Sequence, residues 1–260
     1  MINKKYVKIG LIIIIFLGIF LRVYNLDQES FDFDEIHTMN TLVKNDFKSA
    51  VKTIIQEEDL PTIDSLLLRE WYKLVGDHHF LLRLFPVVFS ILSILILFFL
   101  TKNIFNEHVA LISSLLLSVS MVSISHAQTI RSYSAFTFFT LLSFYFFTRL
   151  NVFLSENKSI NKAEVDHWRY NYLLFIIVTI ISCYINYLAF FSIIIQNMIV
   201  LLNTKSFFQI PKKWVLSQLI IGLFCWPLLI LSSIQLNNLH KLFQYVLFHK
   251  IGMPTILADI

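Results

Sequence analysis

The stretch FLLRLFPVVFSILSILILFFLT, from Phe80 to Thr101, decides the fold class of this chain. Its only charged side chain is that of Arg83, near its start. An apolar run of about 20 residues is long enough to cross the hydrocarbon core of a bilayer as an α-helix. Since lipid offers the backbone no hydrogen-bond partners, a helix is the expected conformation. The chain is therefore expected to be a membrane protein.

The rest of the chain has the same character. Apolar residues make up 57% of its 260 residues and charged residues only 15%, whereas soluble domains carry about 25% charged residues. The net charge of +4 comes from short basic clusters between apolar runs, which does not indicate nucleic-acid binding. We predict an all-α polytopic membrane protein with about seven transmembrane helices. These cover residues 7–24, 80–101, 109–125, 132–150, 170–186, 188–204 and 214–234.

Charges between the apolar segments predict the orientation. The long loop 25–79 carries 12 acidic residues against five Lys and Arg, whereas the short loops on the other side are rich in Lys and Arg. Because short cytoplasmic loops are enriched in Lys and Arg, we expect a cytoplasmic N-terminus and an extracytoplasmic loop 25–79. The first apolar segment follows Lys4, Lys5 and Lys8 and ends without a small-residue cleavage site. We therefore expect a retained signal anchor in the cell membrane.

The loop 25–79 is expected to be structured. Apolar residues in 36–55 recur at spacings of three and four, which predicts an amphipathic helix lying on the membrane surface. A second juxtamembrane helix should begin near Pro61, a residue favoured in the first helical turn, and end near Gly76. Residues 1–260 are interpreted as a single transmembrane module.

The loop opens with a run of acidic residues, Phe31-Asp32-Phe33-Asp34-Glu35. Asp34 could cap the surface helix, and Glu35 favours the positive N-terminal end of a helix. The alternative is a carboxylate that serves as a general base at the membrane face. Both roles are compatible, because a cap fixes the geometry that a base needs.

Two arginines are candidates for phosphate binding. Arg131 opens the fourth segment, where a guanidinium and a helix N-terminus together favour an anion; the alternative is an arginine that snorkels to the interface. Arg83 lies just inside the second segment, where an ionisable side chain needs a partner or water, and snorkelling is again the alternative. Tyr133 follows Arg131 by two residues.

Other kinds of site find no support in the sequence. It has no Gly-rich phosphate loop, no nucleophile elbow and no pair of histidines at metal-binding spacing. Cys183 and Cys225 lie in apolar segments and indicate neither a disulfide framework nor a thiolate metal site. Asp32 and Asp34 could hold a divalent cation, but two carboxylates are too common a pattern to indicate one. We expect no metal and no cofactor.

The order of these features resembles the membrane glycosyltransferases that use a polyprenyl-phosphate sugar donor. The most similar group is the GT-C type family of dolichyl-phosphate-mannose–protein mannosyltransferases and aminoarabinose transferases. Each of the family's short motifs is unspecific, but their order and spacing over residues 10–200 are characteristic. In this chain they are Arg22–Tyr24, Asp34-Glu35, Pro61, Gly76-Asp77, Arg83-Leu84-Phe85-Pro86, Arg131-Ser132-Tyr133 and Tyr184-Ile185-Asn186-Tyr187.

The chain also departs from the family's pattern. Leu60-Pro61-Thr62-Ile63-Asp64 stands where a His-Pro-Pro-Leu-Tyr-like run is common, Thr129 where a Glu is usual, and Asn186 where a His is common. The family's more variable C-terminal half has no counterpart after the seventh segment. The chain is therefore expected to be a compact or a truncated member.

The resemblance implies an inverting sugar transfer from a polyprenyl-phosphate carrier to an acceptor hydroxyl outside the cytoplasm. Asp34 would act as the base, Glu35 would orient the site or bind the acceptor, and Arg131, Arg83 and Tyr133 would bind the donor phosphate. Asn186 and Tyr187 would contact substrate. The partners are the lipid-linked sugar, membrane lipid and an acceptor lipid, glycan or protein, and no nucleic acid. The Ile-, Asn-, Lys- and Phe-rich composition suggests a bacterial cell-envelope protein.

Two other functions fit the same pattern of segments. A transporter or flippase for lipid-linked sugars would also be polytopic, but should carry polar residues near mid-membrane. A catalytically inactive partner of such an enzyme would keep the fold without transferring sugar. Donor binding and turnover would distinguish these alternatives.

Overall fold

The computed structural model describes residues 4–28, 30–39, 46–56, 63–154, 162–203 and 212–250. Within these ranges the regular structure is helical throughout, as predicted. The helices are α1 (Lys4–Val23), α2 (Phe33–Thr38), α3 (Phe47–Gln56), α4 (Ile63–Val75), α5 (His79–Ile104), α6 (Glu107–Val119), α7 (Met121–Gln128), α8 (Tyr133–Leu154), α9 (Lys162–Ile185), α10 (Ala189–Asn203) and α11 (Lys212–Lys250).

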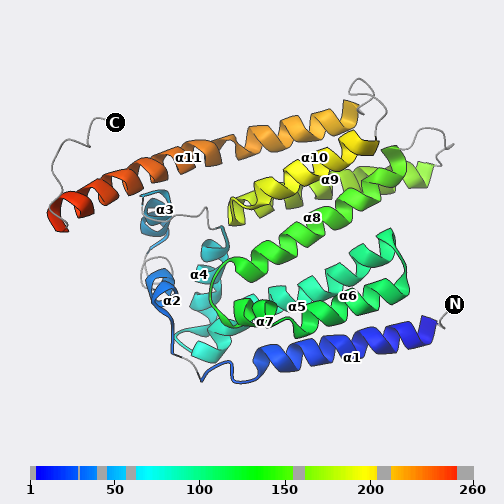
Figure 1. Cartoon of the computed structure of the whole chain (residues 1–260), viewed down its shortest axis with the longest axis horizontal. Coiled ribbons are helices and arrows are strands. Elements are labelled where there is room, and N and C mark those ends of the chain that lie inside the picture. The colour runs from blue at the N-terminus through cyan, green and yellow to red at the C-terminus, as the bar shows by residue number, and fades with distance from the viewer. Residues whose placement is uncertain are drawn as a thin grey trace.

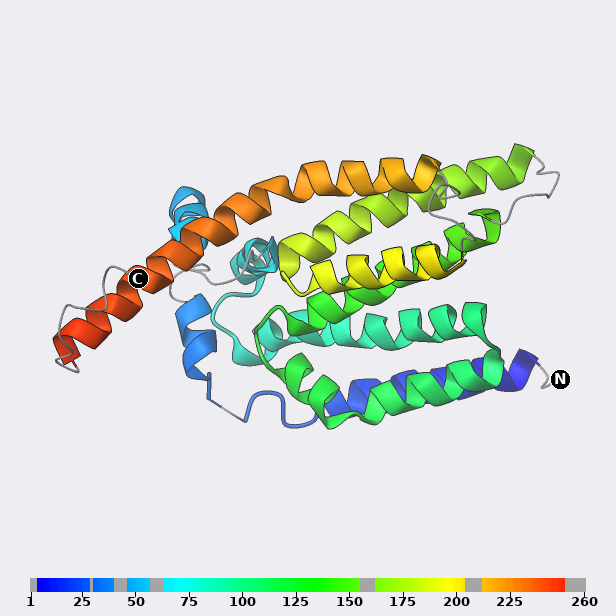
Figure 2. The same ribbon diagram turned by 45° about the horizontal axis from the view of Figure 1, so that its top comes forward.

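The long helices form a bundle with two different ends (Figure 1). One end holds the start of α1 and the C-terminal ends of α5, α8 and α10. The other end holds the short helices α2, α3 and α4 of the long loop, together with α7 and the turn from α7 to α8 (Figure 2). The helix ends that flank the predicted basic loops therefore lie at the opposite end of the bundle from the described helices of loop 25–79, whereas the side of the membrane that each end faces stays a prediction.

The number of spans agrees only in part with the prediction. Among the described helices, four are long and apolar enough to cross a membrane: α1, α5, Trp168–Ile185 of α9 and Lys212–Ser233 of α11. The predicted segment 109–125 is two helices, α6 and α7, which meet at an angle of 55° and together make a fifth candidate. The segments 132–150 and 188–204 correspond to α8 and to the short apolar helix α10, and their crossing of the membrane remains a prediction.

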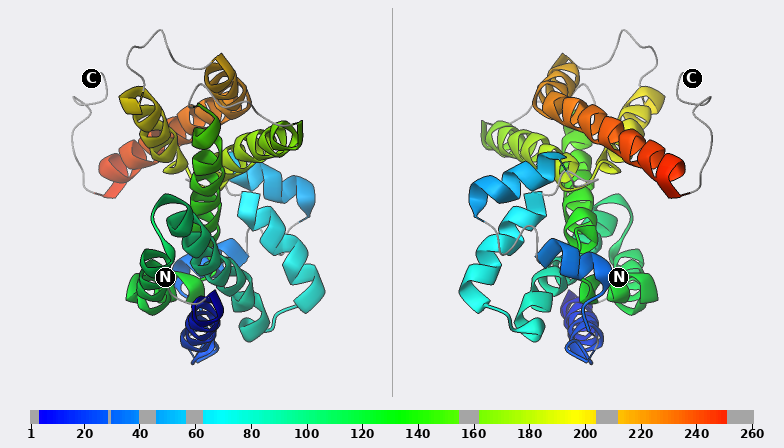
Figure 3. Two further views of the ribbon diagram at one scale, coloured as in Figure 1. Left: turned by 90° about the vertical axis from the view of Figure 1, so that its right-hand side faces the viewer. Right: turned by 90° about the vertical axis from the view of Figure 1, so that its left-hand side faces the viewer.

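Helix α8 lies at the centre of the bundle, between α5 on one side and α9 on the other (Figure 3). Its hydroxyl groups pair with neighbouring helices: Ser143 Oγ is 2.8 Å from Thr179 Oγ1, and Gln196 Nε2 donates to Ser143 Oγ at 3.0 Å. Thr140 Oγ1 is 3.1 Å from Ser182 Oγ. Such hydrogen bonds hold membrane helices together where lipid removes the hydrophobic drive for association. A helix surrounded by protein can thus carry more polar residues than one that faces lipid.

Two predictions about loop 25–79 need correction. The single helix expected over 36–55 is two helices, α2 and α3, with residues 40–45 outside the described part. The N-cap of α2 is Asp32 and not Asp34: Asp32 Oδ1 accepts from Phe33 N at 2.8 Å, and Glu35 Oε2 accepts from Asp32 N at 3.0 Å. An acidic cap with Glu three residues later is a capping box, which leaves Asp34 without a capping role.

The second loop helix, α4, is described from Ile63, so the predicted start near Pro61 lies outside the described residues. Its end at Gly76 is confirmed. Gly76 N donates to Tyr72 O at 2.8 Å, and the φ angle of Gly76 is +66°, a conformation that glycine adopts without strain.

Candidate active site

Asp34 and Arg131 meet at the end of the bundle that carries the short helices. Asp34 is on the first turn of α2, and Arg131 is in the turn between α7 and α8. Asp34 Oδ2 lies 3.7 Å from Arg131 Nη2, and the two side chains are 60% and 21% exposed. The fold thus brings a carboxylate and a guanidinium from distant parts of the sequence side by side, in a position that a ligand can reach.

Glu35, the neighbour of Asp34, faces the interior instead. Its side chain is 2% exposed. Besides its bond with Asp32 N, Glu35 Oε1 accepts from Ile130 N at 2.7 Å, and Oε2 lies 3.1 Å from Arg83 Nη2. Glu35 therefore ties α2 to α5 and to the α7–α8 turn, one residue from Arg131.

Arg83 is equally committed to the protein. Its side chain is 4% exposed, and besides Glu35 it donates to Leu26 O at 2.9 Å and to Ser30 O at 3.3 Å. These carbonyls belong to the connection between α1 and α2. Further hydrogen bonds help a buried ion pair to offset its desolvation cost, and both the Glu35 carboxylate and the two Nη atoms of Arg83 make them. The pair fixes the position of α2.

This arrangement explains why Asp34 and Arg131 are adjacent. Residues next to each other on a helix point in different directions, so a buried Glu35 directs Asp34 outward. The bond from Ile130 N to Glu35 holds the α7–α8 turn against α2, and this brings Arg131 to Asp34. The interior pair acts as a scaffold, and the exposed pair is free to engage a ligand.

Helix α8 begins at Tyr133, two residues after Arg131. Ser132 O accepts from Phe136 N at 2.8 Å as this helix starts. The ring of Tyr133 stacks on that of His126, with ring centres 4.6 Å apart. The unsatisfied amide groups of a helix N-terminus add positive potential to that of Arg131. This corner of the structure suits an anionic oxygen group.

Asn186 and Tyr187 lie in the turn between α9 and α10. Asn186 is buried, and its Oδ1 accepts from Leu188 N at 2.9 Å, which helps to form the turn. Tyr187 packs against the large apolar cluster that α8, α9, α10 and α11 share. These contacts give both residues a role in the packing of the helices. Their role in substrate binding stays a prediction.

Arg22 is a residue that the sequence analysis named only as part of a family motif, without a role. It is fully buried near the end of α1, and its Nη1 and Nη2 donate to Ser118 O at 2.9 Å and Leu117 O at 3.2 Å. These carbonyls belong to the last turn of α6, where helical partners are missing and a cation is favoured. An arginine inside an apolar segment indicates a function or a specific partner, so the position of Arg22 in the segment 7–24 was itself a signal that the sequence offered.

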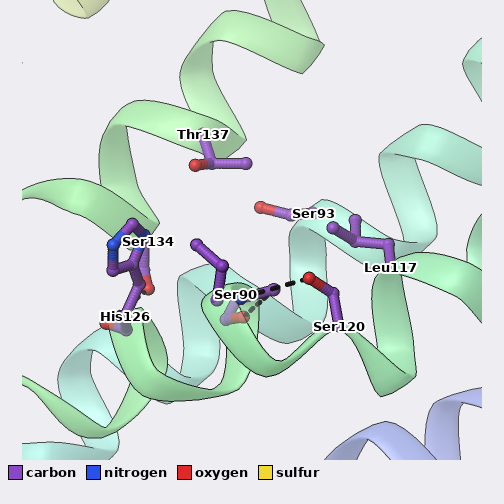
Figure 4. A pocket seen from close by; sticks show the side chains of 9 residues that line it. Ser90, Ser93, Leu117, Ser120, His126, Ser134 and Thr137 are labelled. Carbon is purple, nitrogen blue, oxygen red and sulfur yellow. Dashed lines mark hydrogen bonds between the residues drawn. The ribbon is translucent and has the colours of Figure 1, made fainter.

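Arg22 also reaches a cavity of about 270 Å³ that is lined by residues of α5, α6, α7 and α8 (Figure 4). Its Nε donates to Ser90 Oγ at 2.7 Å and its Nη2 to Ser123 Oγ at 2.8 Å, and both serines line the cavity.

Among the described residues, no group of three or more His, Cys, Asp or Glu side chains could hold a metal ion. Cys183 and Cys225 are both buried as free thiols.

Comparison with protein families adds the observation that decides the relationship. Residues 59–231 match the model of the dolichyl-phosphate-mannose-protein mannosyltransferase family, which is well over half of the chain. The chain belongs to this family. Searches of curated proteins and of solved structures found no match.

Membership of the dolichyl-phosphate-mannose-protein mannosyltransferase family confirms the resemblance drawn from the motifs. Together with the apolar helices, it makes the chain a multi-pass membrane protein of a glycosyltransferase family. The matched region contains Arg83, Arg131 and the α9–α10 turn, whereas Asp34 and Glu35 precede it. Their assignment therefore depends on the geometry described above.

Proposed function

We propose that this chain transfers a sugar from a polyprenyl-phosphate carrier to an acceptor hydroxyl on the extracytoplasmic side of the membrane, with inversion at the sugar carbon. The observation that carries the proposal is the exposed contact between Asp34 and Arg131, 3.7 Å apart at the N-terminus of α8. Family membership supports the class of donor.

In the proposed reaction Asp34 accepts the proton of the acceptor hydroxyl. The hydroxyl oxygen bonds to the anomeric carbon while the bond from that carbon to the phosphate oxygen breaks. The departing polyprenyl phosphate gains one negative charge. Arg131 and the N-terminal amides of α8 stabilise this charge, and such electrostatic contacts are often the largest contribution to catalysis.

The direct contact between Asp34 and Arg131 leaves no space for a sugar between them, so the pair has to open when the donor binds. Opening is inexpensive, because an exposed ion pair contributes only about 0–1 kcal/mol. A hydrogen bond to a charged group contributes about 1.5–3 kcal/mol. A donor phosphate can therefore displace Asp34 from Arg131 and leave the carboxylate available as a base.

Glu35 and Arg83 receive different roles from those that the motifs suggested. Since both side chains are buried and bonded to the protein, we assign them to positioning α2 and the α7–α8 turn. Contact with acceptor or phosphate is left to Asp34 and Arg131. Tyr133, which stacks on His126 beside Arg131, is proposed to line the donor site.

The test separates donor binding from turnover, with purified protein in nanodiscs and polyprenyl-phosphate mannose as the probe. Arg131→Gln should weaken donor binding, whereas Asp34→Asn should bind the donor and fail to consume it. Asp27→Asn, which changes an exposed carboxylate in the α1–α2 connection, is the matched control and should behave like the wild type. Donor binding without turnover in the wild type would contradict the transferase assignment and favour a flippase, whereas a wild type that binds no donor would indicate an inactive partner.

A further inference from the structure

The cavity beside Arg22 is unusually rich in hydroxyl groups. Nine residues line it, six of them Ser or Thr, and no carboxylate is among them. They come from α5 and α8, from α7, and from the end of α6 with the bend that follows it. In Figure 4 the side chains of Ser93, Ser134 and Thr137 surround one space. The hydrogen bonds that these hydroxyls already make determine which ligand the cavity can hold.

One part of the wall is set to donate. Ser90 Oγ and Ser123 Oγ each accept a hydrogen bond from Arg22, at 2.7 and 2.8 Å. A guanidinium has only donors, so both serines keep their own protons. The two oxygens are 3.4 Å apart, and one proton can be shared between them. The other proton remains for a ligand.

The opposite part of the wall is set to accept. Ser93 Oγ donates to Phe89 O at 2.8 Å, and Thr137 Oγ1 donates to Tyr133 O at 2.9 Å. Ser134 Oγ likewise donates to the carbonyl oxygen of His126, at 3.0 Å. Each hydroxyl has one proton and two lone pairs. Because these three hydroxyls already donate their protons to backbone carbonyls, only their oxygen lone pairs are available to a ligand, as acceptors.

A wall that both donates and accepts fits a group that does the same. Sugar hydroxyls do so, whereas a phosphate only accepts and an ammonium only donates. A cation is also disfavoured by the guanidinium behind Ser90 and Ser123. The volume of about 270 Å³ lies just below the range of about 300–1,000 Å³ usual for small-molecule sites, which suits one sugar ring.

The exposed residues beside the cavity indicate from which side such a ligand enters it. Val122 lines the cavity and is 65% exposed, and its neighbour Met121 is exposed as well. Both belong to α7, at the bend of a helix pair that is a candidate membrane span. We propose that this cavity binds the uncharged sugar headgroup of a membrane lipid, with its chain over α7. The inference does not depend on the proposed transfer, because neither Asp34 nor Arg131 lines the cavity.

The test uses the full chain in nanodiscs of phosphatidylethanolamine and phosphatidylglycerol, which contain no sugar. The probe is an alkyl glucoside with a photoreactive diazirine near its headgroup, and the labelled peptide is identified by mass spectrometry. We expect saturable labelling of α7. The double variant Ser93→Ala/Thr137→Val should reduce labelling about tenfold, since two hydrogen bonds are lost. Ser113→Ala removes a similar hydroxyl that donates to Val109 O outside the cavity, and it should have no effect.

Three results would overturn the inference: labelling that does not saturate, equal labelling by a matched alkyl phosphocholine, or labelling unchanged in the double variant. Ser134→Ala replaces the double variant if that protein unfolds. Competition by a neutral glycolipid is expected. Competition by polyprenyl-phosphate mannose would also overturn the inference, because the headgroup of that lipid is charged. Labelling should persist in Asp34→Asn, so that loss of transfer and loss of this site are separable.

Discussion

Replacing Glu35 by Gln should destabilise the fold substantially, although it removes only one charge. Glu35 Oε2 is 3.1 Å from Arg83 Nη2, and both side chains are almost fully buried. Removing one partner of a buried ion pair costs about 3–5 kcal/mol, because the other charge stays buried without compensation. Gln keeps only one acceptor oxygen. It can therefore accept from Ile130 N or from Asp32 N but not from both, and the variant loses an accepted hydrogen bond as well as the charge.

The assay is thermal unfolding of the purified variants in nanodiscs, followed by circular dichroism. Glu35→Gln should lower the unfolding temperature by several degrees. The double variant Glu35→Gln/Arg83→Met should recover much of this loss, because a buried ion pair can often be replaced by apolar side chains at little cost. The control Glu70→Gln changes a carboxylate that is 59% exposed and pairs with Lys73 and Arg69, and it should change little. A wild-type unfolding temperature in Glu35→Gln would refute the scaffold role of this pair.

Three further predictions concern the reaction and the interior of the bundle. Arg131→Gln should lower the transfer rate by about 10²–10³, and Arg131→Lys should retain part of it. Wild-type rates in both variants would exclude the guanidinium from the reaction. Ser143→Ala should reduce stability by about 0.6–1.7 kcal/mol, measured by unfolding in mixed micelles, because the Gln196 amide loses its acceptor. Gly18→Val should reduce folded yield, since a Cβ at Gly18 would lie 2.7 Å from Ile94 Cδ1; a normal yield would show that α1 and α5 can separate.

The apolar runs predicted the long helices well, but they could not predict how each run is interrupted. The segment 109–125 contains neither Pro nor Gly, yet it bends by 55° between α6 and α7. The carbonyls released there bond to Arg22 of α1, a partner that lies far away in the sequence. Local patterns report helix propensity and burial, whereas this bend depends on a tertiary contact.

The site was predicted in outline only. The motifs identified Asp34, Glu35, Arg83 and Arg131, and the structure brings all four to one end of the bundle. Their division into a buried and an exposed pair was not predicted. The spacing of Asp32 and Glu35 in the sequence predicts a capping box, in which the Glu35 side chain turns back to the backbone N–H of Asp32. The pairing of Glu35 with Arg83 could not be predicted in this way, because it depends on how α2 packs against α5.

The central claim is that Asp34 is the base of a sugar transfer assisted by Arg131. Its most direct test is the single-turnover release of polyprenyl phosphate from polyprenyl-phosphate mannose, in membranes that contain the natural acceptors. Wild type and Asp27→Asn should release it at equal rates. Asp34→Asn should release none above the uncatalysed rate while remaining folded and able to bind the donor. Release by Asp34→Asn at a rate near that of the wild type would contradict the account.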